Sequence, residues 1–331
     1  MAVTMADIVK LRKLTGAGMM DCKNALNDAN GDFDEAMKII REKGKAVAAK
    51  RSDREASEGC VLAKAENGYG AMIALKCETD FVANNADFIK LTKDILDVAF
   101  ANKCKTLDEV KELELVPGTT VQQAVTDRSG ITGEKMELDG YATVEGPTIA
   151  VYNHMNRNFL CTMAVLNKPG FDEAGHEVAM QIAAMSPIAI DEASVPQTVK
   201  DNELAVAIQK TKEEQVEKAV VAAINKAGIN ANLVDSEDHI ESNIAKGWLT
   251  EAEAEKAREI RKTVGEQKAA NLPEAMVQNI AKGRMAKFFK DVCLLQQAYN
   301  KDAKITVAEY LKSQDKELTV TDFKRFTLHA E

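Results

Sequence analysis

The segment Cys77–Asn84, which reads Cys-Glu-Thr-Asp-Phe-Val-Ala-Asn, contains the residue types best suited to contact with another molecule. It stands between a two-strand pattern and a long amphipathic helix pattern. Thr79 or Asp80 can accept hydrogen bonds from the free N–H groups at the start of that helix. Phe81 then falls in the first helical turn, on a convex corner where a large apolar side chain is hard to bury. An exposed aromatic beside a carboxylate is typical of a probe for a partner's pocket.

A purely local role is the alternative for these residues. In that case Asp80 only caps the helix, and Phe81 folds back as a hydrophobic staple. Residue types alone favour this local role.

Residues suited to covalent or metal chemistry are scattered. The four histidines (His154, His176, His239, His329) lie far apart, and the six cysteines form no Cys-x-x-Cys pair. The phosphate-loop, nucleophile-elbow and His-Glu-x-x-His motifs are absent from the sequence. Thr15–Gly18 could form a phosphate nest, but it connects two predicted helices, so a turn is the better interpretation. We expect no enzyme activity, no cofactor, no metal site, and free thiols, with a Cys60–Cys77 disulfide disfavoured.

The chain has 331 residues, 29% charged and 5% aromatic, which suits a helix-rich protein of two or three domains. Its net charge of −9 disfavours nonspecific binding to nucleic acid. The first 54 residues carry more Lys and Arg than Asp and Glu, which could orient docking on an acidic partner or simply reflect a solvated helix surface. With no signal core and no run of about 18 apolar residues, we expect a cytoplasmic protein without a membrane span.

Residues 1–54 predict a small three-helix domain followed by a linker. The apolar positions of the three helices recur at helical spacing; they are Ile8 and Leu11, then Cys22, Ala25, Leu26 and Ala29, then Phe33, Ala36, Met37 and Ile40. Asp32 and Glu35 predict the N-terminal cap of the third helix. The basic, Ala- and Gly-containing stretch Lys43–Arg54 predicts a linker.

Two hairpin-plus-helix units follow, and they predict an α+β fold with two subdomains and antiparallel sheets. Strands at 59–65 and 71–77 flank the turn Asn67–Gly70, and the next helix buries Phe88, Leu91, Ile95, Leu96 and Val98. Strands at 148–153 and 158–166 flank a turn at His154–Arg157, and their helix carries Val178, Ile182 and Met185. Segments 135–144 and 318–328 predict further strands. The subdomains are expected at 55–140 and at 141–200 with 280–331.

Residues 201–279 predict a long helical hairpin. Gly228 stops the first helical run, Thr250 and Glu253 predict a capping box, and Pro273 stands near the start of a later helix. We expect Trp248 to be a local core anchor of this hairpin; a ligand contact is the alternative.

The segment Thr79–Val82 closely resembles the Thr-Asp-Phe-Val signature of the elongation factor Ts family. A second family signature is found at Leu11–Leu26, in the right order and at about the right distance. The sequence departs from these patterns at Lys76, where an Asn is expected, and at Leu14, where a basic or polar residue is expected. The resemblance implies a ubiquitin-associated-type module at the N-terminus and exchange of guanine nucleotide on elongation factor Tu.

The resemblance also implies roles for individual residues. Thr79, Asp80, Phe81 and Val82 would bind the GTPase and displace its magnesium- and phosphate-binding elements, and Arg12, Met19, Met20 and His154 would dock on it. For His154 a plain turn residue is the alternative. The family has a shorter helical hairpin, used in some members for self-association. The extra residues, roughly 210–261, therefore make homodimerisation through this segment an open possibility.

Two other classes of function remain as alternatives. A ubiquitin-associated-type adaptor with scaffolding helices would explain the N-terminal helices and the hairpin, but it gives the corner at Thr79–Val82 no role. An enzyme of unrecognised type is the third alternative.

Overall fold

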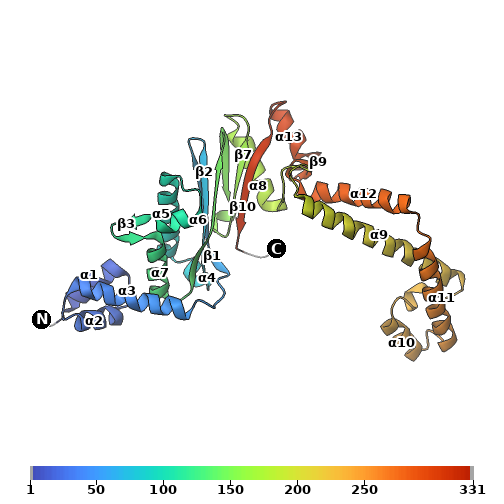
Figure 1. The fold of residues 1–331 in the computed structure, drawn as a ribbon, viewed down its shortest axis with the longest axis horizontal. Helices are drawn as coiled ribbons and strands as arrows, with labels where there is room; N and C mark the ends of the chain where they lie inside the picture. The colour runs from blue at the N-terminus through green and yellow to red at the C-terminus, as the bar shows by residue number, and fades with distance from the viewer. Residues whose placement is uncertain (1–2, 329–331) are drawn as a thin grey trace. The chain divides into compact units, whose positions relative to one another are not determined.

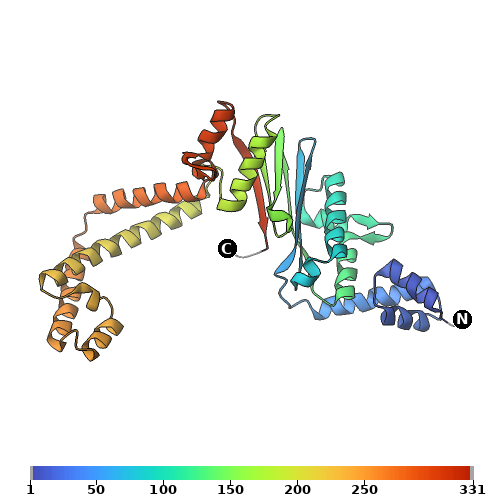
Figure 2. The same cartoon turned by 180° about the vertical axis from the view of Figure 1, so that it is seen from behind.

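The computed structural model describes residues 3–328 (Figures 1 and 2); His329 lies outside them. The chain forms two compact units: one runs to Ile190 and resumes at Gln297, and the other spans Asp191–Gln296. The finer division at residues 54, 140, 200 and 279 stays a prediction.

Three helices form the N-terminal part of the first unit: α1 (Met5–Thr15), α2 (Met19–Asp28) and α3 (Phe33–Lys50). Asp32 caps α3 as expected, accepting a hydrogen bond from the Glu35 N–H at 3.0 Å. The helices share a small apolar core that includes Ile8, Leu11, Cys22, Ala25, Leu26 and Ala36. The predicted three-helix arrangement is confirmed, while its ubiquitin-associated character stays a prediction.

The predicted linker at Lys43–Arg54 is wrong over most of its length, because α3 continues as one helix to Lys50. Ala and Lys are strong helix formers, and the later turns of α3 pack against α7 (Val121–Thr132). Gly44, which suggested flexibility, is buried in that contact. Tertiary packing therefore overrides the helix-breaking tendency of this glycine.

The first sheet is antiparallel with the order β1-β2-β5. Its strands are β1 (Glu58–Glu66), β2 (Tyr69–Cys77) and β5 (Met136–Glu145). Asn67 and Gly68 form the β1–β2 turn with φ of 52° and 76°, the left-handed pair that a tight hairpin requires. The predicted hairpin is confirmed, with strands slightly longer than expected.

Helices α5 (Ala86–Asn102), α6 (Leu107–Glu112) and α7 cover one face of this sheet. Phe88, Ile95 and Leu96 are buried there, as expected, and Leu91 and Val98 are partly buried. The short helix α4 (Asp80–Ala83) precedes α5, and a small hairpin of β3 (Glu114–Val116) and β4 (Thr119–Thr120) precedes α7.

The second sheet is antiparallel with the order β10-β7-β6. Its elements are β6 (Thr148–Asn153), the short 3-10 helix η1 (His154–Asn156), β7 (Leu160–Leu166) and β10 (Val320–Thr327). Helix α8 (Asp172–Met185) packs on β6 and β7; it buries Val178 and Ile182 but leaves Met185 exposed at its end. Strands β8 (Ala298–Tyr299) and β9 (Asp302–Thr306) and helix α13 (Val307–Gln314) lead into β10.

The two sheets pack against each other through a shared apolar core that includes Val61, Met72, Val144, Cys161 and Met163. The first unit is therefore layered, with α5 and α7 outside the first sheet and α8 outside the second (Figures 1 and 2). The predicted α+β class with two antiparallel hairpin-plus-helix subdomains is confirmed.

The second unit is helical. It contains α9 (Gln197–Lys226), η2 (Ala231–Leu233), α10 (Glu237–Ala245), α11 (Glu251–Ala270), α12 (Glu274–Val292) and η3 (Leu294–Gln296). Both α11 and α12 pack on α9, so two helices in succession form the return arm of the predicted hairpin. The capping box of Thr250 and Glu253 is confirmed. None of the helices within residues 3–328 combines the length and the apolar composition that a membrane span requires.

The prediction that Trp248 anchors a local core is wrong, because its side chain is 65% exposed. Gly247 adopts φ of 71°, and after this turn it is Leu249, the residue that follows Trp248, that lies inward, where it is 4% exposed. Leu249 packs with Val220, Ile224 and Ile240 in a local core at the α9–α11 end of this unit. Lys246 lies over the Trp248 ring at 5.2 Å.

Candidate partner-binding site

Phe81 is 87% exposed, so the hydrophobic-staple alternative is wrong. Thr79 caps α4, since its side-chain oxygen accepts a hydrogen bond from the Val82 N–H at 3.4 Å. Val82 is partly buried and Ala83 is buried against the core under the first sheet. One side of this single helical turn is thereby anchored, and Asp80 and Phe81 lie on the other, exposed side.

A carboxylate from a distant part of the chain fixes the backbone of this corner. Glu134, just after α7, accepts hydrogen bonds from the N–H groups of Glu78 and Thr79 at 3.2 and 3.1 Å. It also accepts one from the Thr79 hydroxyl at 2.6 Å. In return, Glu78 accepts the N–H of Lys135 at 2.6 Å. Sequence reasoning missed Glu134, because nothing in its local pattern indicates a partner more than fifty residues away.

The Glu78 carboxylate also pairs with Arg51, at the C-terminal end of α3, at 3.1 Å. The Lys135 N–H and then the Arg51 guanidinium hold the pKa of Glu78 below its usual value. Beneath the corner, the Cys77 thiol donates to the Thr79 carbonyl at 3.3 Å. Burial raises the pKa of this thiol to about 12, so Cys77 stays protonated and serves the packing of the corner.

A second exposed corner lies between β6 and β7. The His154 ring is partly buried, with the Tyr152 hydroxyl 3.1 Å from Nδ1 and the rings of Tyr152 and Phe159 at its edges. The next residue, Met155, is 66% exposed and has φ of 53°. A left-handed backbone is unfavourable for a methionine, and such strain is concentrated at functional positions. Sequence reasoning missed Met155, since the sequence does not reveal backbone angles.

The two corners lie at the same end of the paired sheets. Glu58, the first residue of β1, pairs with Cys77, directly before the first corner. Three residues further along β1, the Val61 N–H donates to the Asn158 carbonyl, in the second corner, at 2.6 Å. At about 3.3 Å per strand residue, these two attachment points on β1 are roughly 10 Å apart. A single partner surface can therefore contact both corners.

The predicted docking residues of the N-terminal helices differ in exposure. Arg12 and Met20 are exposed, Met20 at 64%, whereas Met19 is partly buried against the core of its own helices. Met5 and Val9 are also exposed on α1, and their spacing places them on the same helical face as Arg12. This face extends the predicted docking surface.

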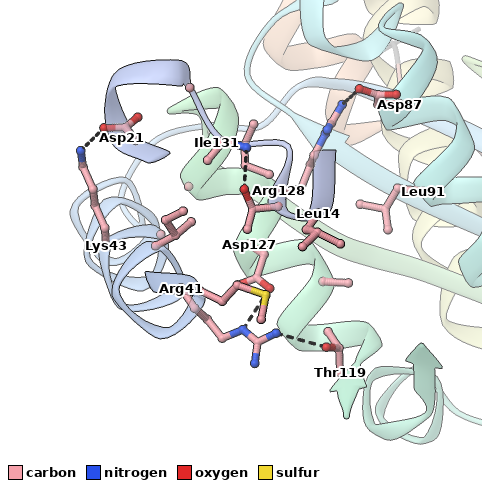
Figure 3. A pocket seen from close by; sticks show the side chains of 18 of the residues that line it. Leu14, Asp21, Arg41, Lys43, Asp87, Leu91, Thr119, Asp127, Arg128 and Ile131 are labelled. Carbon is pink, nitrogen blue, oxygen red and sulfur yellow. Dashed lines mark hydrogen bonds and ion pairs between the residues drawn. The ribbon is translucent and has the colours of Figure 1, made fainter. Parts of the chain in front are cut away.

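A pocket of about 320 Å³ lies between the α1–α2 turn and α3 on one side and α7 on the other (Figure 3). Its charges are paired: Arg41 with Asp127 at 3.4 Å, Arg128 with Asp87 at 3.3 Å, and Lys43 with Asp21. Burial raises the pKa of Asp127, and Arg41 opposes that shift. No group of three metal-ligating side chains was found in the described part of the chain.

An exposed aromatic and an exposed methionine on fixed corners are features of a protein that acts through contact with a partner. The chain matches the family model for elongation factor Ts over residues 78–237 and 222–330. It is 69% identical to an elongation factor Ts of Bacteroides fragilis, 68% to one of Bacteroides thetaiotaomicron and 42% to one of Porphyromonas gingivalis. Each match covers the whole of both chains, including the region of residues 210–261. The chain belongs to the elongation factor Ts family.

Proposed function

We propose that this protein acts in translation elongation as the guanine-nucleotide exchange factor of elongation factor Tu. The observation that carries the proposal is the corner at Thr79–Val82, whose anchored turn leaves Phe81 87% exposed. Family membership supports the same activity. The protein needs no covalent chemistry and no cofactor for this task, and it works in the cytoplasm.

The physical basis of exchange is linkage. A factor that binds the nucleotide-free GTPase more tightly than the loaded form must weaken nucleotide binding by the same ratio. A P-loop GTPase holds its nucleotide through backbone amides, a lysine and a magnesium ion that bridges the phosphates. Phe81 inserts between elements of the partner and displaces those that position the magnesium ion. Burial of one Phe side chain contributes about 1.5–3 kcal/mol towards this distortion.

The other predicted residues support the insertion of Phe81. Thr79 and Val82 fix the turn, and Asp80 orients it through hydrogen bonds to the partner's backbone. Arg12, Met19 and Met20 dock the N-terminal helices on the GTPase, and Met suits this surface because its side chain adapts to irregular contacts. His154 provides the contact at the second corner. The helical segment of roughly residues 210–261 contributes a self-association surface.

Release of a fluorescent GDP analogue from elongation factor Tu, with and without this protein, tests the proposal. We expect a large acceleration of release at catalytic amounts of the protein. Unchanged release, together with retention of ubiquitin-like or helical partners in a pull-down, would favour a scaffolding adaptor instead.

A further inference from the structure

Helices α3 and α7 touch backbone to backbone at Gly44 and Gly130. A Cβ atom at residue 130 would lie 2.2 Å from the Gly44 Cα and 3.2 Å from its carbonyl carbon. Real Cβ atoms do not approach backbone so closely, so α3 would have to move. A Cβ at residue 44 would meet the Gly130 Cα at 3.5 Å, an ordinary contact. The crossing therefore depends on glycine at 130 and tolerates a small side chain at 44.

Contacts on both sides of the crossing also connect the N-terminal helices to the rest of the first unit. Arg41 on α3 pairs with Asp127 on α7 and donates to the Thr119 hydroxyl at 3.3 Å. At the end of α3, Arg51 pairs with Glu78 in the Phe81 corner. One continuous helix thus joins the core of the N-terminal helices to the corner.

Side-chain packing beside the crossing is incomplete. The pocket of about 320 Å³ is lined by Gly44 and Gly130 together with apolar side chains such as Leu14 and Ile131 (Figure 3). Interiors are normally close-packed, so an open pocket leaves few side-chain contacts to fix the angle between the helices. The Gly44–Gly130 contact, together with the Arg41 contacts above, therefore sets that angle.

We propose that Gly130 is a positioning residue for partner binding. Its lack of a side chain lets α3 seat on α7, and this seating fixes the N-terminal docking surface relative to Phe81. The inference rests on the proposed function, because it assumes that both surfaces engage one GTPase. A protein that presents two surfaces in a fixed geometry loses less conformational entropy on binding than one that joins them by a flexible tether.

The test compares Gly130→Ala with Gly44→Ala at the same contact. Both changes improve helix propensity, and Gly283→Ala in α12, where a Cβ meets nothing within 4 Å, controls for that gain. Spin labels at the exposed positions Asn24→Cys on α2 and Asp108→Cys on α6 report the distance between the N-terminal helices and the rest of the first unit. The six native cysteines are all buried, so the labels go to the introduced thiols. Calorimetry gives the affinity for nucleotide-free elongation factor Tu.

We expect Gly130→Ala to shift or broaden the label distance and to weaken GTPase binding about tenfold, equivalent to about 1.4 kcal/mol. Gly44→Ala and Gly283→Ala should match the wild type in both measurements. An unchanged distance and affinity in folded Gly130→Ala would overturn the inference. If Gly130→Ala does not fold, Gly44→Leu takes its place in the test, because the larger leucine side chain must also push the two helices apart. A label distance and affinity like those of the wild type in Gly44→Leu would equally overturn the inference.

Failure of the proposed function looks different. In that case the wild-type protein neither binds the GTPase nor releases its nucleotide, while the label distances still respond to Gly130→Ala. A third outcome is that the wild type exchanges nucleotide, while Gly130→Ala alters the label distance but leaves the affinity unchanged. Gly130 would then fix the angle between the helices, but the angle would not matter for binding. That result would also overturn the positioning role.

Discussion

Glu134 accepts hydrogen bonds from both the hydroxyl and the N–H of Thr79, at 2.6 and 3.1 Å. Thr79 uses the same hydroxyl oxygen to cap α4, so one carboxylate orients the residue that starts the exposed turn. A hydrogen bond to a charged group contributes about 1.5–3 kcal/mol. Glu134 therefore helps to hold the turn that presents Phe81.

Glu134→Ala should lower the free energy of unfolding by about 1–3 kcal/mol and slow nucleotide release more than that loss of stability explains. Glu134→Gln keeps one acceptor oxygen for Thr79 and should recover part of both losses. Urea unfolding and GDP release measure the two effects, with Glu112→Ala as a control at an exposed carboxylate on α6. Wild-type exchange by Glu134→Ala per folded molecule would show that Glu134 serves stability alone.

Phe81→Ala should reduce nucleotide release strongly and leave the fold unchanged. Truncation of an interface hot spot costs about 2 kcal/mol or more, a factor of roughly thirty. Because the side chain is 87% exposed in the free protein, its removal should change the free energy of unfolding by no more than about 0.5 kcal/mol. Trp248→Ala removes another exposed aromatic, from the second unit, and should leave release unchanged. Normal exchange by Phe81→Ala would remove the central residue of the proposed mechanism.

The Glu78 carboxylate should make stability depend on pH in the acid range. Its pKa is lowered in the folded protein by the Lys135 N–H and by Arg51, whereas the unfolded chain has the ordinary value of about 4.3. An acid with a lowered folded pKa contributes its full stabilisation above the unfolded pKa and loses it as pH falls through the folded pKa. Wild type should thus exceed Glu78→Gln in free energy of unfolding at neutral pH and approach it below about pH 4. Urea unfolding across this range checks the trend; a gap independent of pH would contradict it.

Local signals in the sequence predicted much of the fold. Asn67 and Gly68 specify a tight turn by their own conformational preferences, and Asp32 and Thr250 specify helix starts by their own hydrogen bonds. Each of these predictions is confirmed because the partner lies within a few residues.

Features that depend on distant partners could not be predicted in this way. Gly44 suggested a linker, because the local sequence does not show its contact with Gly130. Only that contact makes glycine useful at this place inside a helix. Trp248 was expected to anchor the local core of the hairpin, whereas Leu249, after the turn at Gly247, is the buried residue. Glu134 and Met155 gave no local signal at all. The residues that hold the candidate site in place were therefore harder to recognise than Phe81 itself.

Arg12 and Met20 offer a cleaner test of docking than removal of residues 1–54, because deletion of α3 would expose the face of α7 that it covers. Arg12→Ala combined with Met20→Ala should weaken binding to the GTPase, with little change in melting temperature, since both side chains are exposed. Met19→Ala should also lower the melting temperature, because Met19 packs on the core of the N-terminal helices. Calorimetry and thermal unfolding separate the two cases. Full affinity in the double variant would exclude this surface from docking.

Trp248 is the only tryptophan of the chain, so its fluorescence reports directly on the turn between α10 and α11. In the isolated protein its exposed ring should emit at long wavelength and be accessible to a soluble quencher. If the surface around Trp248 mediates self-association, burial of the Trp248 ring should shift its emission to shorter wavelength as protein concentration rises. Trp248→Ala should then remain monomeric in sedimentation at concentrations where the wild type associates.

Leu249 provides the matched comparison for Trp248. Leu249→Ala removes a buried side chain and should destabilise the local core by about 2–5 kcal/mol, whereas Trp248→Ala should leave it intact. The two corners proposed to act in exchange lie in the first unit, so neither change should slow nucleotide release. Emission that stays constant across concentrations, with identical sedimentation of wild type and Trp248→Ala, would exclude self-association through this surface. Loss of exchange in folded Trp248→Ala would instead assign Trp248 a contact with the GTPase.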